Sequence, residues 1–164
     1  MSTKNLSEFD KTTIPSAKNM NFGIIAAEWN PEITDSLKDG AKKTLINLGA
    51  EEKNIIVKRV PGTFELSLAG QWMAEYTDVD AIILLGCVIQ GETRHFDFIC
   101  QSVTKGTTEL GMKYNKPFIF GIVTAQNQQQ AIDRSGGKLG NKGDEAAVAA
   151  IKMVALKEEM KEKR

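Results

Sequence analysis

The sequence predicts an α/β fold, in which a four-stranded parallel sheet is covered by helices on both faces to give three α/β/α layers. Short apolar runs alternate along the chain with segments whose apolar residues recur at helical spacing. Because parallel strands are usually joined by helical crossovers, this alternation indicates a parallel sheet. The run at 81–85 is apolar throughout, as in a strand buried on both faces.

Each element follows from its local sequence. The expected strands cover residues 22–26, 55–57, 81–85 and 117–123. The expected helices cover residues 31–48, 64–75, 95–112 and 126–134, with a last one from about 142 to the C-terminus. Pro31 suits a first helical turn, Gly49 suits a helix end, and Thr124 is a candidate cap for the fourth helix.

The chain is expected to end in a glycine-rich loop and an amphipathic helix. Residues 135–143 contain several glycines and predict a loop. The alanine-rich helix that follows places one set of apolar residues on a single face, which predicts packing against the sheet layer. These residues are Ala147, Ala150, Ile151 and Val154.

Length and composition indicate one domain at residues 21–164, preceded by a polar arm at residues 1–20. The arm is either a disordered tail or a segment that pairs with a neighbouring subunit; order near Ile14 and Pro15 would favour the second.

The formal net charge of +0 argues against a nucleic-acid binder with a broad basic surface.

Other features narrow the location and the chemistry. No apolar run approaches the ~20 residues of a membrane helix, and the N-terminus lacks an apolar signal core, so we expect no membrane partner and a cytoplasmic protein. Cys87 and Cys100 fit reduced thiols there. With one histidine and no close cysteine pair, a metal site is not expected.

Candidate functional residues follow three of the predicted strands. Active sites of parallel sheets lie at the carboxyl ends of the strands. Trp29 and Asn30 follow the first strand, residues 62–65 follow the second, and residues 88–95 follow the third. We therefore expect these residues to meet at one edge of the sheet.

The third of these segments joins a possible anion site to the only histidine. Gly91, Glu92 and Thr93 precede a helix whose first backbone N–H groups attract an anion. His95 follows at once, and imidazole titrates near neutrality, which suits proton transfer. Taken alone, the same residues also fit an ordinary helix cap and an exposed histidine.

Several other chemistries lack their motifs. The sequence contains no Gly-x-Ser-x-Gly elbow, no Gly-x-Gly-x-x-Gly fingerprint and no Walker P-loop. A phospho-receiver domain needs an aspartate at the end of the third strand, where Cys87 and Val88 stand.

Four separate segments together resemble one known family. They are 61–65 (PGTFE), 86–97 (GCVIQGETRHFD), 120–124 (FGIVT) and 140–143 (GNKG). In these segments, and over about residues 21–156, the chain is similar to the 6,7-dimethyl-8-ribityllumazine synthases of riboflavin biosynthesis. The resemblance implies a flavodoxin-like fold and a cofactor-free enzyme that condenses 5-amino-6-(D-ribitylamino)uracil with 3,4-dihydroxy-2-butanone 4-phosphate.

The resemblance also implies roles for individual residues. His95 would transfer protons, and an adjacent subunit would contribute Phe120, Arg134 and Lys142. The residues expected at the pyrimidine and ribityl chain are Trp29, Asn30, Gly62, Thr63, Phe64, Glu65, Val88, Ile89, Phe120 and Lys142. Those expected at the phosphate are Gly91, Glu92, Thr93 and Arg134, with Lys142 beside them. Glu92 departs from the small residue usual in this family, so we expect its backbone to face the ligand.

The same resemblance implies a homopentamer and leaves open a 60-subunit shell of twelve pentamers. The short turn at 135–141 allows a shell, whereas Pro15 in the arm opposes strand pairing there because proline lacks an N–H. Two other interpretations stay open: another synthase of the same superfamily, such as an archaeal-type riboflavin synthase, and a non-enzymatic flavin-binding or shell protein.

Overall fold

The structure is a computed structural model that describes residue 5 and residues 7–163. Four parallel strands form the sheet in the order β2-β1-β3-β4. They are β1 (Phe22–Ala27), β2 (Ile55–Val60), β3 (Ala81–Ile89) and β4 (Phe118–Ala125). This confirms the predicted four-stranded parallel sheet.

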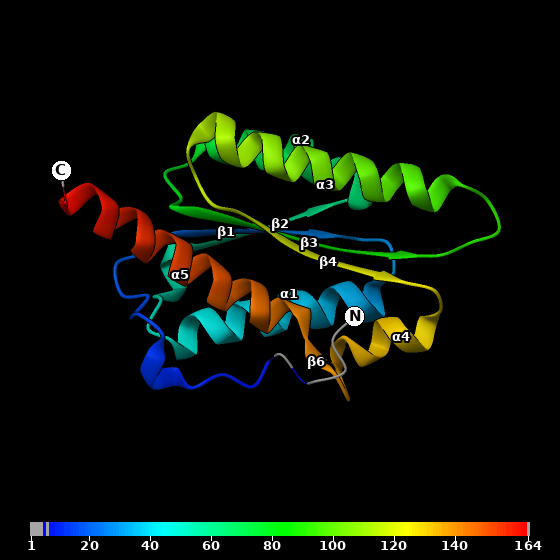
Figure 1. Cartoon of the computed structure of the whole chain (residues 1–164), viewed down its shortest axis with the longest axis horizontal. Coiled ribbons are helices and arrows are strands. Elements are labelled where there is room, and N and C mark those ends of the chain that lie inside the picture. The colour runs from blue at the N-terminus through cyan, green and yellow to red at the C-terminus, as the bar shows by residue number, and fades with distance from the viewer. Residues whose placement is uncertain (1–4, 6, 164) are drawn as a thin grey trace.

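Helices cover both faces of the sheet, as the sequence predicts. The longer helices are α1 (Pro31–Asn47), α2 (Leu66–Tyr76), α3 (His95–Tyr114), α4 (Gln128–Asp133) and α5 (Lys142–Glu162). Short 3-10 helices are η1 (Lys11–Thr13), η2 (Glu52–Asn54) and η3 (Thr63–Glu65). Figure 1 shows α2 and α3 on one face and α1, α4 and α5 on the other.

The central strand runs further than the sequence predicts, and this moves a helix cap. β3 continues from Leu85 to Ile89, because Val88 pairs with Thr124 and Ile89 with Ala125 of β4. Thr124 is therefore a strand residue, and its prediction as the cap of α4 is wrong. Asn127 caps α4 instead, since its side chain accepts a hydrogen bond from the Gln130 N–H at 3.0 Å.

The glycine-rich segment predicted as a loop forms a small hairpin. Its strands are β5 (Ser135–Gly137) and β6 (Gly140–Asn141), which pair antiparallel. Gly136 and Gly140 have φ angles of +108° and +86°, which side chains rarely allow. The hairpin therefore depends on these two glycines, and β6 leads directly into α5.

The core is divided between the two faces of the sheet. Ala81 to Cys87 in β3 are all buried, as expected for a strand covered on both sides. On the face of α5, the predicted apolar residues are buried and pack in the core below the sheet. These residues are Ala147, Ala150, Ile151 and Val154.

The described part of the N-terminal arm packs on its own chain. Ile14 and Ala17 are buried in the core below the sheet, and the Ala17 N–H donates to the Leu48 carbonyl at 2.9 Å. Residues 1–4 and 6 lie outside the described residues. Pairing of the arm with a neighbouring subunit stays a prediction.

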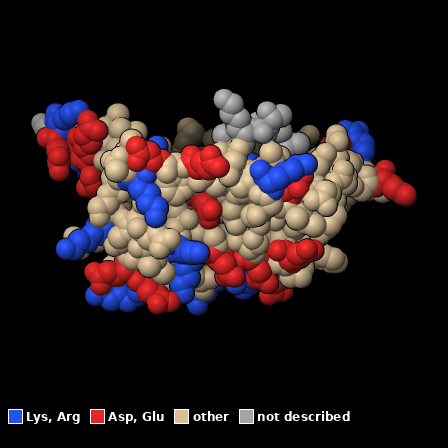
Figure 2. All heavy atoms as spheres, turned by 90° about the horizontal axis from the view of Figure 1, so that it is seen from below, with Lys and Arg blue, Asp and Glu red and all other residues tan. Residues whose placement is uncertain are grey.

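The described surface matches the even charge composition. On the face seen in Figure 2, Lys and Arg side chains lie among Asp and Glu side chains, so neither charge covers it as one patch. Among the described residues, none of the helices is both long enough and apolar enough to cross a membrane.

Candidate active site

A cavity of about 570 Å³ opens at the carboxyl ends of β1, β2 and β3. It brings together nine of the residues that the sequence analysis assigns to a site: Trp29, Asn30, Gly62, Thr63, Phe64, Glu65, Val88, Ile89 and His95. These residues come from three strand ends and from the first turn of α3. They meet at one edge of the sheet, as expected for residues at the carboxyl ends of parallel strands.

Trp29 presents its indole at the mouth of the cavity. Trp29 is 74% exposed, while its backbone N–H donates a hydrogen bond to the Pro61 carbonyl at 3.1 Å. A β-carbon at Gly62 would lie 3.4 Å from Trp29 Cδ1 and 3.1 Å from Glu65 Oε2. Gly62 thus lets the indole and the carboxylate approach each other over the backbone. An exposed aromatic face beside a carboxylate suits a planar ligand that carries hydroxyl groups.

Asn30 ties the first strand to the third. It has a left-handed backbone (φ +57°), in which its carbonyl accepts from the N–H groups of Ile33 and Thr34 at the start of α1. Its side-chain Nδ2 donates to the Cys87 carbonyl at 3.2 Å. The buried Thr63 hydroxyl donates to the same carbonyl at 3.5 Å. The strand ends that frame the cavity are therefore fixed to one another.

His95 begins α3 and is exposed at the cavity wall. Its backbone N–H donates to Thr93 Oγ1 at 3.3 Å, so Thr93 helps to start the helix. Gly91, Glu92 and Thr93 are exposed beside the cavity, and no described residue accepts a hydrogen bond from their N–H groups. Free N–H groups next to a helix start are suited to an anion.

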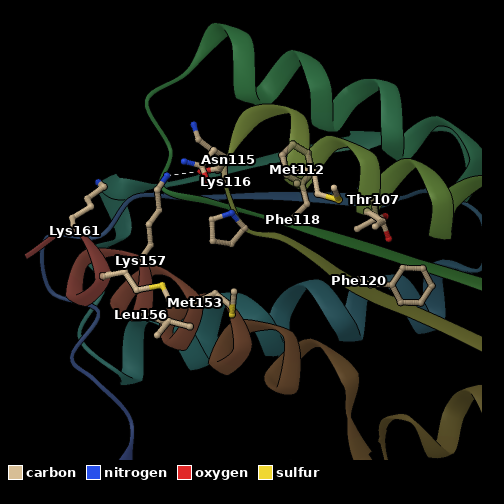
Figure 3. Close-up of a pocket in the computed structure, with 14 residues that line it drawn as sticks. Thr107, Met112, Asn115, Lys116, Phe118, Phe120, Met153, Leu156, Lys157 and Lys161 are labelled. Atoms are coloured by element: carbon tan, nitrogen blue, oxygen red, sulfur yellow. Dashed lines mark hydrogen bonds between the residues drawn. The ribbon is translucent and has the colours of Figure 1, made fainter. Parts of the chain in front are cut away.

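The other predicted residues lie outside this cavity. Phe120 belongs to β4 and lines a different cavity beside that strand. Arg134 and Lys142 flank the β5–β6 hairpin, and both lie close to Glu145. Arg134 Nη2 is 3.0 Å from Glu145 Oε1, and its Nη1 donates to the Leu139 carbonyl at 2.9 Å. Within one chain, Phe120, Arg134 and Lys142 therefore lie apart from the residues of the cavity, and Figure 3 shows Phe120 in the pocket beside β4.

Two further residues line the cavity that the sequence analysis did not assign to it. Cys87 lies at the end of β3, where burial raises the pKa of its thiol to about 12, so the thiol stays protonated near neutrality. Ile99 lies one turn after His95 on α3, and this spacing would have placed it on the same helix face.

The sequence model that describes 6,7-dimethyl-8-ribityllumazine synthase matches residues 19–158 of the chain. The chain belongs to the 6,7-dimethyl-8-ribityllumazine synthase family. The match includes the cavity at the strand ends as well as Phe120, Arg134 and Lys142.

Individual members of the lumazine synthase family are similar over nearly their full length. The enzyme of that name from Cytophaga hutchinsonii is 58% identical over 93% of this chain and 95% of its own. The one from Parabacteroides distasonis is 54% identical over 92% and 94%. The one from Flavobacterium johnsoniae is 51% identical over 95% and 82%.

Proposed function

We propose that this chain catalyses the lumazine synthase reaction. It would condense 5-amino-6-(D-ribitylamino)uracil with 3,4-dihydroxy-2-butanone 4-phosphate to give 6,7-dimethyl-8-ribityllumazine, phosphate and water. The observation that carries this proposal is the cavity at the strand ends, which joins an exposed aromatic face, a carboxylate and the only histidine. Family membership supports the choice of substrates.

The reaction proceeds through an imine. The amine at position 5 of the pyrimidine attacks the ketone carbonyl, and loss of water forms the C=N bond. Loss of the proton from C3 of the butanone then expels phosphate from C4 with the electron pair of the C–O bond, and the enol that results takes a proton at C4 to become a ketone at C3. The ribitylamino nitrogen attacks this ketone, and loss of a second water closes the ring. Each step moves protons to or from nitrogen, oxygen or carbon, so a side chain that can both accept and donate a proton accelerates it.

The residues of the cavity take distinct parts. The Trp29 indole stacks on the pyrimidine, Glu65 accepts hydrogen bonds from the ribityl hydroxyls, and the backbone of Val88 and Ile89 binds the pyrimidine edge. His95, which lies in the cavity wall, transfers the protons. Holding two reactive molecules in line supplies much of the rate, because it removes the entropy cost of their encounter.

The phosphate group binds beside the cavity. The N–H groups of Gly91, Glu92 and Thr93, which have no acceptor among the described residues, bind it, and the exposed Glu92 keeps its carboxylate away from it. Arg134 and Lys142 of an adjacent subunit add positive charge, and an Arg fork can bind two phosphate oxygens. Phe120 of that subunit covers the second face of the pyrimidine.

The shared site requires an assembly, for which we propose a homopentamer in the cytoplasm. Twelve pentamers can form a 60-subunit shell, because the turn at 135–141, in which β5 pairs with β6, is short. A ring suffices for activity, since one interface completes one site.

A single assay tests the proposal. The purified protein is mixed with the two substrates, and lumazine fluorescence is followed with time. We expect product formation without added metal or redox cofactor. A protein that binds flavins but forms no lumazine would overturn the proposal and favour the non-enzymatic flavin-binding alternative.

A further inference from the structure

The N-terminal arm touches the β5–β6 hairpin through a small turn. The Ser7 N–H donates to Asn5 Oδ1 at 3.0 Å, so the two residues form an Asn-initiated turn. A β-carbon at Gly140 would collide with Asn5 Oδ1 and with Ser7 Oγ. The turn therefore lies directly over Gly140, the first residue of β6.

The arm is anchored on the same chain close to this turn. Phe9 packs against the core below the sheet, and Ile14 and Ala17 are buried in that core. Between them, Asp10 caps η1, because its carboxylate accepts from the Thr12 N–H at 2.9 Å. The burial of these apolar residues offsets the entropy cost of ordering the arm. Ser7 is thus held beside the hairpin by its own chain.

The backbone groups of Asn141 point out of the hairpin. The Lys142 N–H donates to the Arg134 carbonyl at 2.9 Å, so residues 134 and 142 form a hydrogen-bonded pair. In antiparallel strands, such pairs alternate with pairs whose N–H and C=O groups point outward. Residue 141, opposite Ser135, belongs to a pair of the second kind. Its N–H and C=O therefore need partners from outside the hairpin.

The Ser7 hydroxyl satisfies both of these groups. The Asn141 N–H donates to Ser7 Oγ at 2.6 Å, and the hydroxyl donates to the Asn141 carbonyl at 3.0 Å. Asn141 is only 9% exposed, and a shielded backbone group without a partner is costly. One serine side chain thus takes the place of a neighbouring strand at the edge of β6.

The side chain of Asn141 is fixed as firmly as its backbone. Its Oδ1 accepts from the Gly143 N–H at 2.8 Å, which caps α5. Its Nδ2 donates to the Ser36 carbonyl of α1 at 3.1 Å. The bonds to Ser7 are therefore the part of this set that ties Asn141 to the arm.

We propose that Ser7 is a positioning residue for the phosphate site. By holding Asn141, it sets where the next residue, Lys142, and its backbone partner, Arg134, present their charges. Glu145 gathers both cations, so a displaced hairpin would move them together. The inference rests on the proposed function, because it assumes that these two cations bind the phosphate group. Ser7 itself does not contact the substrate and acts only through the hairpin.

The effect should be confined to one of the two substrates. The residues proposed to bind the pyrimidine within the cavity come from strand ends and from the first turn of α3. Loss of the Ser7 contact leaves those elements in place. A general loss of folding, in contrast, would weaken the binding of both substrates.

Hydrogen exchange in the full chain without ligands tests the contact. Ser7→Ala should speed exchange of the Asn141 amide by about two- to tenfold, the factor expected for one ordinary hydrogen bond. The Ala17 amide should keep its rate, because it donates to the Leu48 carbonyl outside the contact. Ser7→Thr keeps a hydroxyl and should restore the wild-type rate at Asn141. An unchanged Asn141 rate in Ser7→Ala would overturn the contact.

Calorimetric titration with each substrate alone tests the positioning, since one substrate cannot turn over. Ser7→Ala should raise the Kd of 3,4-dihydroxy-2-butanone 4-phosphate by about two- to tenfold and leave the Kd of the pyrimidine unchanged. Ser7→Thr should return the first Kd to the wild-type value. Ser16→Ala is the matched control, because the hydroxyl of this second arm serine accepts only a local bond from the Lys18 N–H, at 3.2 Å.

The titrations separate the inference from the proposed reaction. Equal affinities of wild type and Ser7→Ala for the phosphorylated ketone, or an equal loss for both substrates, contradict the positioning role. A wild type without affinity for the phosphorylated ketone removes the phosphate site and the inference with it. A wild type that forms no lumazine, but loses affinity for this ketone on Ser7→Ala and regains it on Ser7→Thr, overturns the proposed reaction alone.

Discussion

Arg134 and Glu145 form an ion pair across the β5–β6 hairpin, with Nη2 of the guanidinium 3.0 Å from Oε1 of the carboxylate. Both side chains are mostly shielded, with 13% and 14% exposure. Lys142 Nζ lies 3.5 Å from the other oxygen of the same carboxylate. Glu145 thus fixes two cations at one point, and an arriving phosphate would meet an arginine already held in place.

Arg134→Ala is expected to weaken the binding of the phosphorylated substrate far more than the binding of the pyrimidine. A charge-assisted hydrogen bond is lost at one ligand only, which costs about 1.5–3 kcal/mol, or roughly ten- to a hundredfold in Kd. Titration of each substrate measures this. Lys138→Ala is the control, because Lys138 is in the same hairpin but pairs with Asp133. If the affinities for both substrates fell equally, Arg134 would not be a phosphate-binding residue.

His95→Ala is expected to lower turnover by about 10²–10⁴-fold while changing substrate affinity much less. Activity persists, because the cavity still aligns the amine and the ketone. Steady-state kinetics separates kcat from KM. Lys105→Ala, an exposed change on the same helix, should leave both unchanged. Wild-type turnover without His95 would exclude it from the mechanism.

Trp29 fluorescence is expected to fall when a pyrimidine or flavin-like ligand binds, because the ring stacks on the exposed indole. Trp72 lies on α2, outside the cavity at the strand ends, and should respond less. The comparison is between the wild type and Trp29→Phe, which keeps an aromatic face but removes the signal. Quenching of equal depth in that variant would place the ligand elsewhere.

Gly40→Ala is expected to destabilise the protein, although alanine normally favours a helix interior. A β-carbon at position 40 of α1 would lie 2.6 Å from Asp144 Oδ1 and 2.7 Å from Asn141 Nδ2. Both atoms are held by hydrogen bonds, Asp144 Oδ1 from the Thr44 hydroxyl and Asn141 Nδ2 to the Ser36 carbonyl. Moving them costs about 1–3 kcal/mol, which over most of that range is more than the gain of about 1 kcal/mol in helix propensity. Denaturant unfolding measures the difference.

The matched control for Gly40 is Gly91→Ala, because no atom lies within 4 Å of a β-carbon there. Its free energy of unfolding should stay near the wild-type value. A Gly40→Ala protein as stable as the wild type would show that α1 and α5 can separate at this point without cost.

Cys87 is expected to make stability fall as pH rises from about 9 to about 12. Burial raises the pKa of its thiol in the folded protein from the ordinary 9.0 to about 12. In this window the unfolded chain loses the thiol proton and the folded chain keeps it, so unfolding becomes easier. The free energies of unfolding of the wild type and Cys87→Ala should therefore diverge with pH. Parallel curves would mean that the folded thiol ionises normally.

Much of the fold was predictable because its signals are local. Short apolar runs that alternate with helical segments predicted the four strands. Because active sites lie at the ends of parallel strands, Trp29, Gly62 and His95 could be expected to share one cavity. The extension of β3 to Ile89 was missed because it depends on pairing with β4, which also turned Thr124 into a strand residue.

Features that depend on distant contacts were not predictable. The left-handed backbone of Asn30 is stabilised by a bond to Cys87, which is far away in the sequence. Arg134 meets Glu145 of α5 because the antiparallel pairing of β5 with β6 folds the chain back between them. The location of Arg134 outside the cavity could be expected only from the family resemblance, not from spacing.

Subunit complementation tests most directly whether each site is shared between two chains. His95→Ala and Arg134→Ala subunits are unfolded, mixed in equal amounts and refolded together, and lumazine formation is compared with that of each variant refolded alone. If His95 and Arg134 come from different chains, about a quarter of the interfaces in random rings carry both residues and regain wild-type activity. If the mixture is no more active than the average of the two variants, although mass spectrometry shows mixed rings, the shared site is contradicted.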